Sequence, residues 1–354
     1  MEPDLKNIIK VLIVEDSPSV CKVLTDILNS DLHIMVTGVA HNGKEAVEMA
    51  SCLKPNIITM DIHMPVMDGL EATKQIMARN PVPILIICAS ALEIETGMAF
   101  KAISYGALDI IEKGQAGIAG NEKYRKNLIE KIKFLSGIKV IRHPLAAFSD
   151  KNEIKKPFEI PKKEILDRII AIATSTGGPN ALHKILKDFP KKLPCGVVIV
   201  QHIATGFLEG LITWLNSECQ IKVKIAENSE EICAGTVYMA PTDLQMRVEE
   251  GGRIHISNEP IYNGHRPSGD ILLESVANVY KEKAIGVILT GMGRDGSMGI
   301  KAIKQMKGQT IAQDENSCAV FGMPKAAIDM GVADNVLPLE NITEKIMQIL
   351  RNNI

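Results

Sequence analysis

RIIAIATSTGGP (168–179) decides the fold of the larger part of this chain. An almost unbroken apolar run leads to Thr174 and Ser175, a glycine turn follows, and the apolar spacing over 180–189 predicts a helix. Strands that are covered on both faces of a parallel sheet have such continuous apolar runs. The stretch therefore reads as one strand–turn–helix unit.

The same alternation continues to the end of the chain. Further strands are expected at 195–202, 221–227, 235–241, 284–290 and 309–314. Further helices are expected at 206–216, 270–280, 296–306 and 324–330, with a hairpin-like insertion near 245–256. Strands that alternate with helices predict a doubly wound α/β domain, which we place at 165–354.

The first third of the chain has its own alternation. Apolar runs predict strands at 11–17, 34–40, 56–61, 84–90 and 107–113. Helical spacing lies between them, at 18–29, 43–52, 69–79 and 96–105. We expect a flavodoxin-like α/β domain with a five-stranded parallel sheet over 8–122. Residues 123–164 then read as the end of a helix and a basic, proline-containing linker.

The composition of the 354 residues is that of a globular protein, with 46% hydrophobic and 23% charged residues and a net charge of −2. This charge gives no whole-chain attraction to nucleic acid or to an anionic membrane. The seven cysteines contain no CxxC pair, which favours free thiols in a reducing compartment. No signal peptide and no apolar run near the ~18 residues of a membrane span occur, so we expect a cytoplasmic protein without membrane insertion.

Acidic side chains stand at the predicted strand ends of the first domain, where ligands of open α/β sheets bind. Glu15, Asp16 and Asp61 would repel one another unless a cation lies among them, and oxygen ligands favour Mg²⁺. Ser90 and Lys113 end two further strands and suit phosphoryl oxygens. Each residue alone could be a helix cap or a turn former. Together they favour a phosphate-accepting site with an aspartate nucleophile.

These residues resemble the receiver domain of two-component response regulators over residues 8–120. The matching text is VEDS (14–17), MDIHMPVMDG (60–69), the serine of ASA (89–91) and the lysine of EKG (112–114). Two positions differ from the family: Gly114 replaces the usual proline, and Ile110 replaces an aromatic that often reports the switch.

The resemblance implies that a histidine kinase phosphorylates Asp61. It also implies a set of contacts around that residue. Mg²⁺ would be held by Glu15, Asp16, Asp61 and the backbone carbonyl of His63, and the phosphoryl group would be contacted by Ser90 and Lys113.

A serine, a histidine and an aspartate end three predicted strands of the second domain: Ser175, His202 and Asp295. A serine hydroxyl becomes a nucleophile when an imidazole takes its proton, and a buried carboxylate orients that imidazole. The glycines after Ser175 also allow a sharp turn that exposes N–H groups to an oxyanion. Plain alternatives are that Ser175 is a helix cap and His202 an ordinary histidine. Rival bases are His183, His255 and His265.

Residues 165–350 resemble the catalytic domain of chemotaxis protein-glutamate methylesterases. The matching segments are STGGP (175–179), QH…GF (201–207), APTD (240–243), HRPSGD (265–270), TGMGRDG (290–296) and AQDENSCAVFGMP (312–324). Ala173-Thr174 stands where that family usually has Gly-Ala.

This resemblance implies a phosphorylation-activated serine hydrolase. Ser175 would be the nucleophile, His202 the general base and acid, and Asp295 the orienting carboxylate, with the N–H groups of Thr176 and Met292 as the oxyanion hole. The substrates would be glutamate methyl esters of chemoreceptors, with release of methanol, and receptor glutamines would be deamidated. No cofactor is expected in the catalytic domain. The unphosphorylated receiver would cover the Ser175 cleft.

Parts of the sequence are compatible with three other functions. GMGRDG (291–296) has the GxGxxG spacing of a dinucleotide site, but it comes late in its domain, and Asp295 would repel a pyrophosphate. A DNA-binding response regulator would need a smaller and more basic second domain. A binding module with a vestigial triad differs from an enzyme only in activity.

Overall fold

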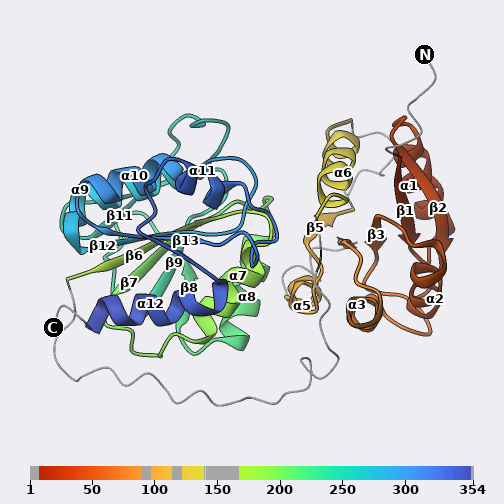
Figure 1. Ribbon diagram of the computed structural model, residues 1–354, viewed down its shortest axis with the longest axis horizontal. Coiled ribbons are helices and arrows are strands. Elements are labelled where there is room, and N and C mark those ends of the chain that lie inside the picture. Colours follow the sequence, from red (N-terminus) through yellow and green to blue (C-terminus); the bar gives the residue numbers. More distant parts are fainter. Residues whose placement is uncertain (1–7, 89–96, 114–121, 139, 141–166, 352–354) are drawn as a thin grey trace. The chain divides into compact units, whose positions relative to one another are not determined.

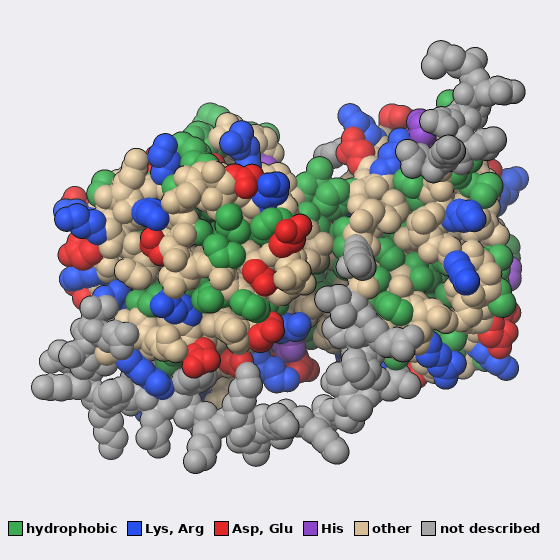
Figure 2. Space-filling model, in the orientation of Figure 1, with side chains coloured by type: hydrophobic (Ala, Val, Ile, Leu, Met, Phe, Trp, Pro, Cys, Tyr) green, Lys and Arg blue, Asp and Glu red, His purple; other side chains and the backbone are tan. Residues whose placement is uncertain are grey.

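The structure is a computed structural model that describes residues 8–88, 97–113, 122–138, 140 and 167–351 (Figure 1). The chain folds as two compact units, Met1–Glu153 and Ile154–Ile354. Within the described residues, no helix is both long enough and apolar enough to span a membrane. On the face seen in Figure 2, basic and acidic side chains are interspersed over each unit, as the nearly neutral composition suggests.

The first unit has a five-stranded parallel sheet in the order β2-β1-β3-β4-β5, which confirms the expected architecture. Its strands are β1 (Ile9–Val14), β2 (Ile34–Ala40), β3 (Ile57–Met60), β4 (Ile84–Cys88) and β5 (Asp109–Glu112). Its helices are α1 (Pro18–Asn29), α2 (Gly43–Leu53), α3 (Gly69–Arg79), α5 (Met98–Ser104) and α6 (Glu122–Leu135).

The order of these strands places a crevice at one edge of the sheet. From β1 the chain proceeds to β2 on one side and then to β3 on the other, so the connections leave the sheet on opposite sides of this pair. Ligands of open α/β sheets bind at such a switch point, outside the carboxyl ends of the strands. Glu15 follows β1, and Asp61 follows β3.

The second unit has a seven-stranded parallel sheet in the order β14-β13-β12-β6-β7-β9-β8 and a separate antiparallel hairpin, β10-β11. The sheet strands are β6 (Ile169–Thr174), β7 (Gly196–Gln201), β8 (Lys222–Ile225), β9 (Thr236–Met239), β12 (Ala284–Ile288), β13 (Gln309–Gln313) and β14 (Asn335–Leu337). The hairpin consists of β10 (Gln245–Glu249) and β11 (Arg253–Ser257), at the place where an insertion was expected.

Helices cover both faces of this sheet. In Figure 1, α9, α10 and α11 lie on one face, and α7, α8 and α12 lie on the other. Their bounds are α7 (Gly178–Lys187), α8 (Leu208–Glu218), α9 (Gly269–Tyr280), α10 (Ser297–Gln305), α11 (Met323–Asp329) and α12 (Leu339–Arg351), and a 3-10 turn, η4 (Lys281–Lys283), follows α9. The elements β14 and α12 extend the fold beyond those expected from the sequence.

The central strand β6 explains why its end is a site. It is buried along its whole length and pairs with β12 on one side and β7 on the other. The strands β7, β9 and β8 lie on one side of β6, and β12, β13 and β14 lie on the other. The residue after β6, Ser175, therefore lies at the switch point of the second sheet.

Candidate active site and acidic pocket

The carboxyl ends of β12, β6 and β7 bring the serine, histidine and aspartate of the sequence analysis to one edge. The amide of Ser175 donates to Thr290 O at 3.0 Å, across from β6 to the chain that follows β12. The amide of His202 donates to Thr174 O at 2.9 Å, across from β7 to β6. Asp295 lies in the loop between β12 and α10.

Gln201 ties two of these strand ends together. Its side chain is 3% exposed, and its Nε2 donates to Ser175 O at 2.9 Å and to His202 O at 2.8 Å. One amide group thus fixes the backbone of the serine relative to that of the histidine. Gln201 belongs to the segment QH…GF (201–207), but its position in the sequence does not predict a role for its amide.

Asp295 is a buried carboxylate held by one neighbouring chain segment. Oδ1 accepts from Ser268 Oγ at 2.7 Å and from Asp270 N at 3.1 Å, and Oδ2 accepts from Gly269 N at 2.6 Å. These donors lie at the start of α9, where the helix dipole also favours an anion. Burial alone raises the pKa of Asp295, but His202 and the donors of Ser268 and Gly269 outweigh it and lower the pKa to about 2.

His202 faces Asp295. Its Nε2 lies 2.8 Å from Asp295 Oδ2, yet neither ring nitrogen makes a hydrogen bond with the described residues. Catalytic hydrogen bonds are often poorly aligned before substrate binds. Because Nε2 faces the carboxylate, the buried Nδ1 is the nitrogen left to take a proton.

The rival histidines lie in different places. His183 on α7 is next to the Trp214 ring, and burial lowers its pKa to about 4. His255 on β11 is a partly exposed partner of Glu249. His265, by contrast, stacks on His202, with ring centroids 4.3 Å apart and planes 4° apart.

His202, His265 and Asp295 offer atoms within 4.8 Å of one another, and such side chains can bind zinc. The lone pair of an imidazole nitrogen lies in the plane of its ring, so two stacked, parallel rings do not direct their nitrogens to a common ion. The oxygens of Asp295 also already accept three hydrogen bonds. This geometry does not fit a metal centre.

Glycines allow a close approach of the chain around Ser175. Gly177, the residue before α7, adopts φ +78°. A Cβ on Gly291 would lie 2.8 Å from the Cβ of Ser175, so only glycine allows this close approach. In the described part of the chain, the amides of Thr176 and Met292 donate no hydrogen bond. They are therefore available to an oxyanion.

The structure has room for Ala173 and Thr174, which stand where the family usually has Gly-Ala. A Cβ on Gly269 or Gly296 would come within 3 Å of Ala173 Cβ, so these glycines leave room for the alanine methyl group. The hydroxyl of Thr174 is buried and donates to Thr290 O at 2.9 Å. Neither side chain occupies the place of the serine.

The acidic pocket of the first unit contains a buried lysine between two carboxylates. Lys113 Nζ lies 2.5 Å from Glu15 Oε2 and 3.1 Å from Asp61 Oδ1. Burial raises the pKa of both carboxyl groups despite the lysine. Burial lowers the pKa of Lys113, but its two acidic partners outweigh this effect and raise it.

The oxygen atoms of this pocket fit a divalent cation. Carboxylate oxygens of Glu15, Asp16 and Asp61 lie within 4.8 Å of one another, and oxygen donors are what Mg²⁺ binds. His63 follows on the same loop as Asp61. Ser90, however, lies outside the described residues, as does the Gly114 departure.

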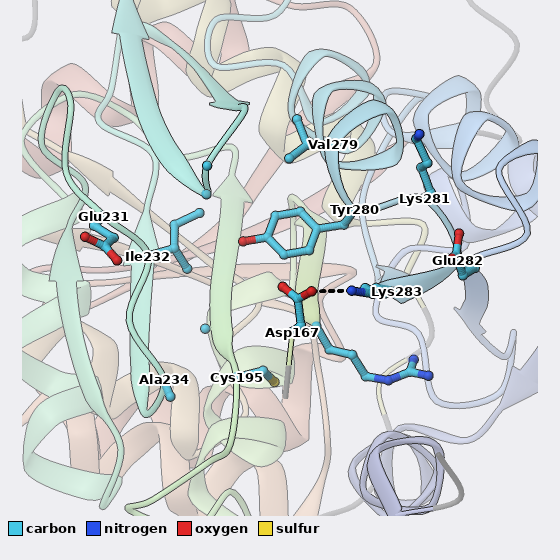
Figure 3. A pocket seen from close by; sticks show the side chains of 14 residues that line it. Asp167, Cys195, Glu231, Ile232, Ala234, Val279, Tyr280, Lys281, Glu282 and Lys283 are labelled. Carbon is cyan, nitrogen blue, oxygen red and sulfur yellow. Dashed lines mark hydrogen bonds and ion pairs between the residues drawn. The ribbon is translucent and has the colours of Figure 1, made fainter. Parts of the chain in front are cut away.

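A separate cavity of about 520 Å³ lies at the other edge of the second sheet, near the amino ends of β6 and β7 (Figure 3). Tyr280 points into it, and Asp167 forms an ion pair with Lys283 at its rim. Acidic and basic residues line it alike, so its charge selects no ligand.

These observations define a class of protein: a receiver domain joined to a parallel-sheet α/β domain with a serine, a histidine and an aspartate at its strand ends. Comparison with known proteins agrees. The response regulator receiver domain family matches residues 11–118, and the CheB methylesterase family matches residues 170–346. The chain belongs to the CheB methylesterase family.

Relatives extend over nearly the whole chain. A protein-glutamate methylesterase/protein-glutamine glutaminase from Nitrosospira multiformis is 40% identical and covers 97% of both chains. One of the same name from Pyrococcus abyssi is 42% identical over 96% of this chain and 93% of its own. The CheB methylesterase catalytic domain of Thermotoga maritima, solved as a crystal structure, is 41% identical, with a TM-score of 0.50 over 51% of this chain and 98% of that one.

Proposed function

We propose that this chain hydrolyses glutamate methyl esters on the cytoplasmic part of chemoreceptors and is activated by phosphorylation at Asp61. The observation that supports the esterase is the 2.8 Å contact between His202 Nε2 and the buried, hydrogen-bonded Asp295, at the end of β7, which pairs with the strand that leads to Ser175. The receiver would occupy 8–122, a linker 123–164 and the esterase 165–354, in the cytoplasm.

The chemistry follows from the arrangement of the three side chains. His202 Nδ1 takes the proton of Ser175 Oγ as that oxygen bonds to the ester carbonyl carbon. The amides of Thr176 and Met292 stabilise the oxyanion. His202 then returns the proton to the departing methoxy oxygen, and methanol leaves.

A water molecule completes the cycle by attacking the acyl-serine with His202 as base. This restores Ser175 and leaves a free glutamate. A glutamine side chain follows the same path with ammonia as the leaving group, which accounts for a glutaminase activity. Asp295 remains ionised throughout and stabilises the imidazolium that forms.

In the receiver, Asp61 would take a phosphoryl group from a histidine kinase. Glu15, Asp16, Asp61 and the His63 carbonyl would hold Mg²⁺, which neutralises phosphoryl charge when bound. The ammonium of Lys113, already 3.1 Å from Asp61, would pair with the phosphoryl oxygens, and Ser90 would donate to them. No nucleic-acid or membrane contact is part of this function.

Methanol release from methylated receptor membranes tests the esterase. Ser175→Ala should lower the rate by several orders of magnitude in a folded protein, because the acyl-serine cannot form. Ser217→Ala, at an exposed serine on α8, is the matched control and should retain wild-type activity. Near-normal turnover of folded Ser175→Ala would refute the serine mechanism.

Phosphorylation is tested with a small phosphodonor and Mg²⁺. Asp61→Asn should abolish acid-labile phosphate incorporation, whereas Asp26→Asn, at an exposed aspartate on α1, should leave it intact. Chelation of Mg²⁺ should abolish it in the wild type. Unchanged incorporation by Asp61→Asn would assign the phosphate to another residue.

A further inference from the structure

We propose that His265 is a positioning residue of the esterase, whose ring lies against the face of the His202 ring and fixes its orientation. This inference rests on the proposed function of His202 as the catalytic base. It gives a role to a histidine that sequence reasoning could only treat as a rival of His202.

Few contacts fix the orientation of the His202 ring, so a further residue is needed to position it. Its Nε2 lies 2.8 Å from Asp295, but neither ring nitrogen has a hydrogen bond among the described residues. One short contact leaves the ring free to turn about its Cβ–Cγ bond. The flat face of His265, 4.3 Å away and parallel within 4°, restricts that rotation.

His265 is itself held at its backbone. Its amide donates to Tyr262 O at 2.9 Å, and the amide of Tyr262 donates back to His265 O at 3.0 Å. Gln245, a fully buried residue of β10, donates from Nε2 to His265 O at 3.2 Å. The backbone that carries the stacked ring is therefore held in place by hydrogen bonds.

Gln245 also couples the ring to the carboxylate. Its Oε1 accepts from Ser268 N at 2.9 Å, and Ser268 is the first of the residues that hold Asp295. A single buried amide thus sets the spacing between His265 and the start of α9. The segment 262–270 thus supplies both the ring that lies on the face of His202 and the donors that hold Asp295 at the edge of that ring.

The stack also suits the charge that His202 carries during the reaction. Burial, and then His202, lower the pKa of His265, while Asp295 raises it less; these two are the titratable groups that face the ring. A neutral His265 does not repel an imidazolium, and the face of an aromatic ring attracts a cation. The ring also keeps water from one side of the base.

Two variants separate the ring face from the ring nitrogens. His265→Ala should lower kcat by about 10–100-fold with little change in KM, because misplacement of a catalytic group costs rate. His265→Phe retains a flat ring and should stay close to wild type. His255→Ala, at a partly exposed histidine of β11 that does not contact His202, is the matched control.

The pH profile of kcat/KM provides a second readout. In His265→Ala, water reaches His202 and stabilises its protonated form, so the acid limb should move to higher pH. His265→Phe should keep the wild-type limb. All variants are measured as full-length, phosphorylated protein on methylated receptors, with melting curves to establish folding.

Three results would overturn the inference. They are wild-type kcat and acid limb in folded His265→Ala, an equal loss in His265→Phe and His265→Ala, and a loss confined to KM, which would make His265 a substrate contact. Failure of the proposed function itself is distinguishable, because Ser175→Ala would then retain activity in the same assay.

Discussion

Asp295 is the residue on which the geometry of the active site depends. Its two oxygens receive donors from three consecutive residues, and the imidazole of His202 lies against one of them. A buried carboxylate is tolerated only when its charge is compensated in this way. In the proposed mechanism this compensation connects catalysis to stability, because the same contacts would orient the base and hold the start of α9.

Asp295→Asn should therefore weaken the second unit in a pH-dependent way. The pKa of Asp295 in the folded protein, about 2, lies below the ordinary aspartate value of 3.8, so the carboxylate contributes stability above pH ~4 that is lost as the pH falls toward 2. The full contribution is about 2 kcal/mol. The stability gap between wild type and variant should shrink below pH 4.

Urea unfolding followed by Trp214 fluorescence measures this gap. Trp214 is the single tryptophan of the chain and is buried on α8, so it reports the second unit alone. The exposed Asp329→Asn substitution on α11 serves as a control. A gap that stays constant from pH 7 to pH 3 would contradict the assigned role of the carboxylate.

In the first unit, Lys113 compensates buried charge as the partners of Asp295 do in the second. Lys113→Met leaves Glu15 and Asp61 buried without their cation, which should cost about 3–5 kcal/mol. Mg²⁺ can replace the missing charge, so it should raise the melting temperature of the variant more than that of the wild type. Lys10→Met, at an exposed position on β1, is the control. Equal shifts in variant and wild type would show that the ion binds elsewhere.

At the scale of elements, the start of α3 is fitted against the end of β3. A Cβ on Gly69 would lie 1.9 Å from the carbonyl oxygen of Asp61, and the amide of Gly69 donates to Ile62 O at 2.8 Å. The helix can therefore approach Asp61, the proposed phosphate acceptor, only through glycine.

Gly69→Ala should displace Asp61, destabilise the first unit by about 1–3 kcal/mol and slow phosphate incorporation. Gly137→Ala is the matched change, since its Cβ would meet its nearest neighbour at 3.6 Å, an ordinary contact. Thermal unfolding and phosphorylation rates compare the two. If both variants behave alike, close packing at Gly69 is not what positions Asp61.

Most elements could be predicted because buried parallel strands have continuous apolar runs that local sequence reveals. The strand β14 could not, since three residues at a sheet edge show no period. The helix α12 had a readable signal in the spacing of Leu339, Ile342 and Ile346, but the expected helices stopped at residue 330.

The candidate site was predictable to the extent that it lies at strand ends. Ser175, His202 and Asp295 follow β6, β7 and β12, so the strand-end rule brought them together. The amide of Gln201 and the stack of His265 depend on contacts between segments far apart in the chain. Spacing along the sequence contains no signal for such contacts.

At the scale of the whole molecule, two units with separate sites are joined in one chain. The family resemblance implies that the unphosphorylated receiver restrains the esterase. Phosphorylation then shifts a population from closed to open molecules. Activation can therefore raise the esterase rate by no more than the inverse of the fraction of molecules that are already open.

Deletion of residues 1–160 should give a constitutively active esterase, about 10–100-fold faster than the unphosphorylated full chain. The corresponding domain of the Thermotoga maritima protein was solved by itself, which supports folding of the fragment. Methylated receptor is the appropriate substrate, because a small ester could enter past a partial cover. A fragment no faster than the unphosphorylated full chain would leave recruitment or direct stimulation as the effect of the receiver.

The late position of β12 in the chain has a consequence for synthesis on the ribosome. β12 pairs beside the central β6, yet it is translated after β7, β8, β9 and the hairpin, and Asp295 follows it. Domains generally fold from the N-terminus as they emerge, so the receiver is complete while the hydrolase still lacks half of its sheet. In the proposed function, a nascent chain would therefore accept phosphate before it could release methanol. A messenger RNA truncated before β12 would encode a protein that accepts phosphoryl groups but lacks a complete esterase domain.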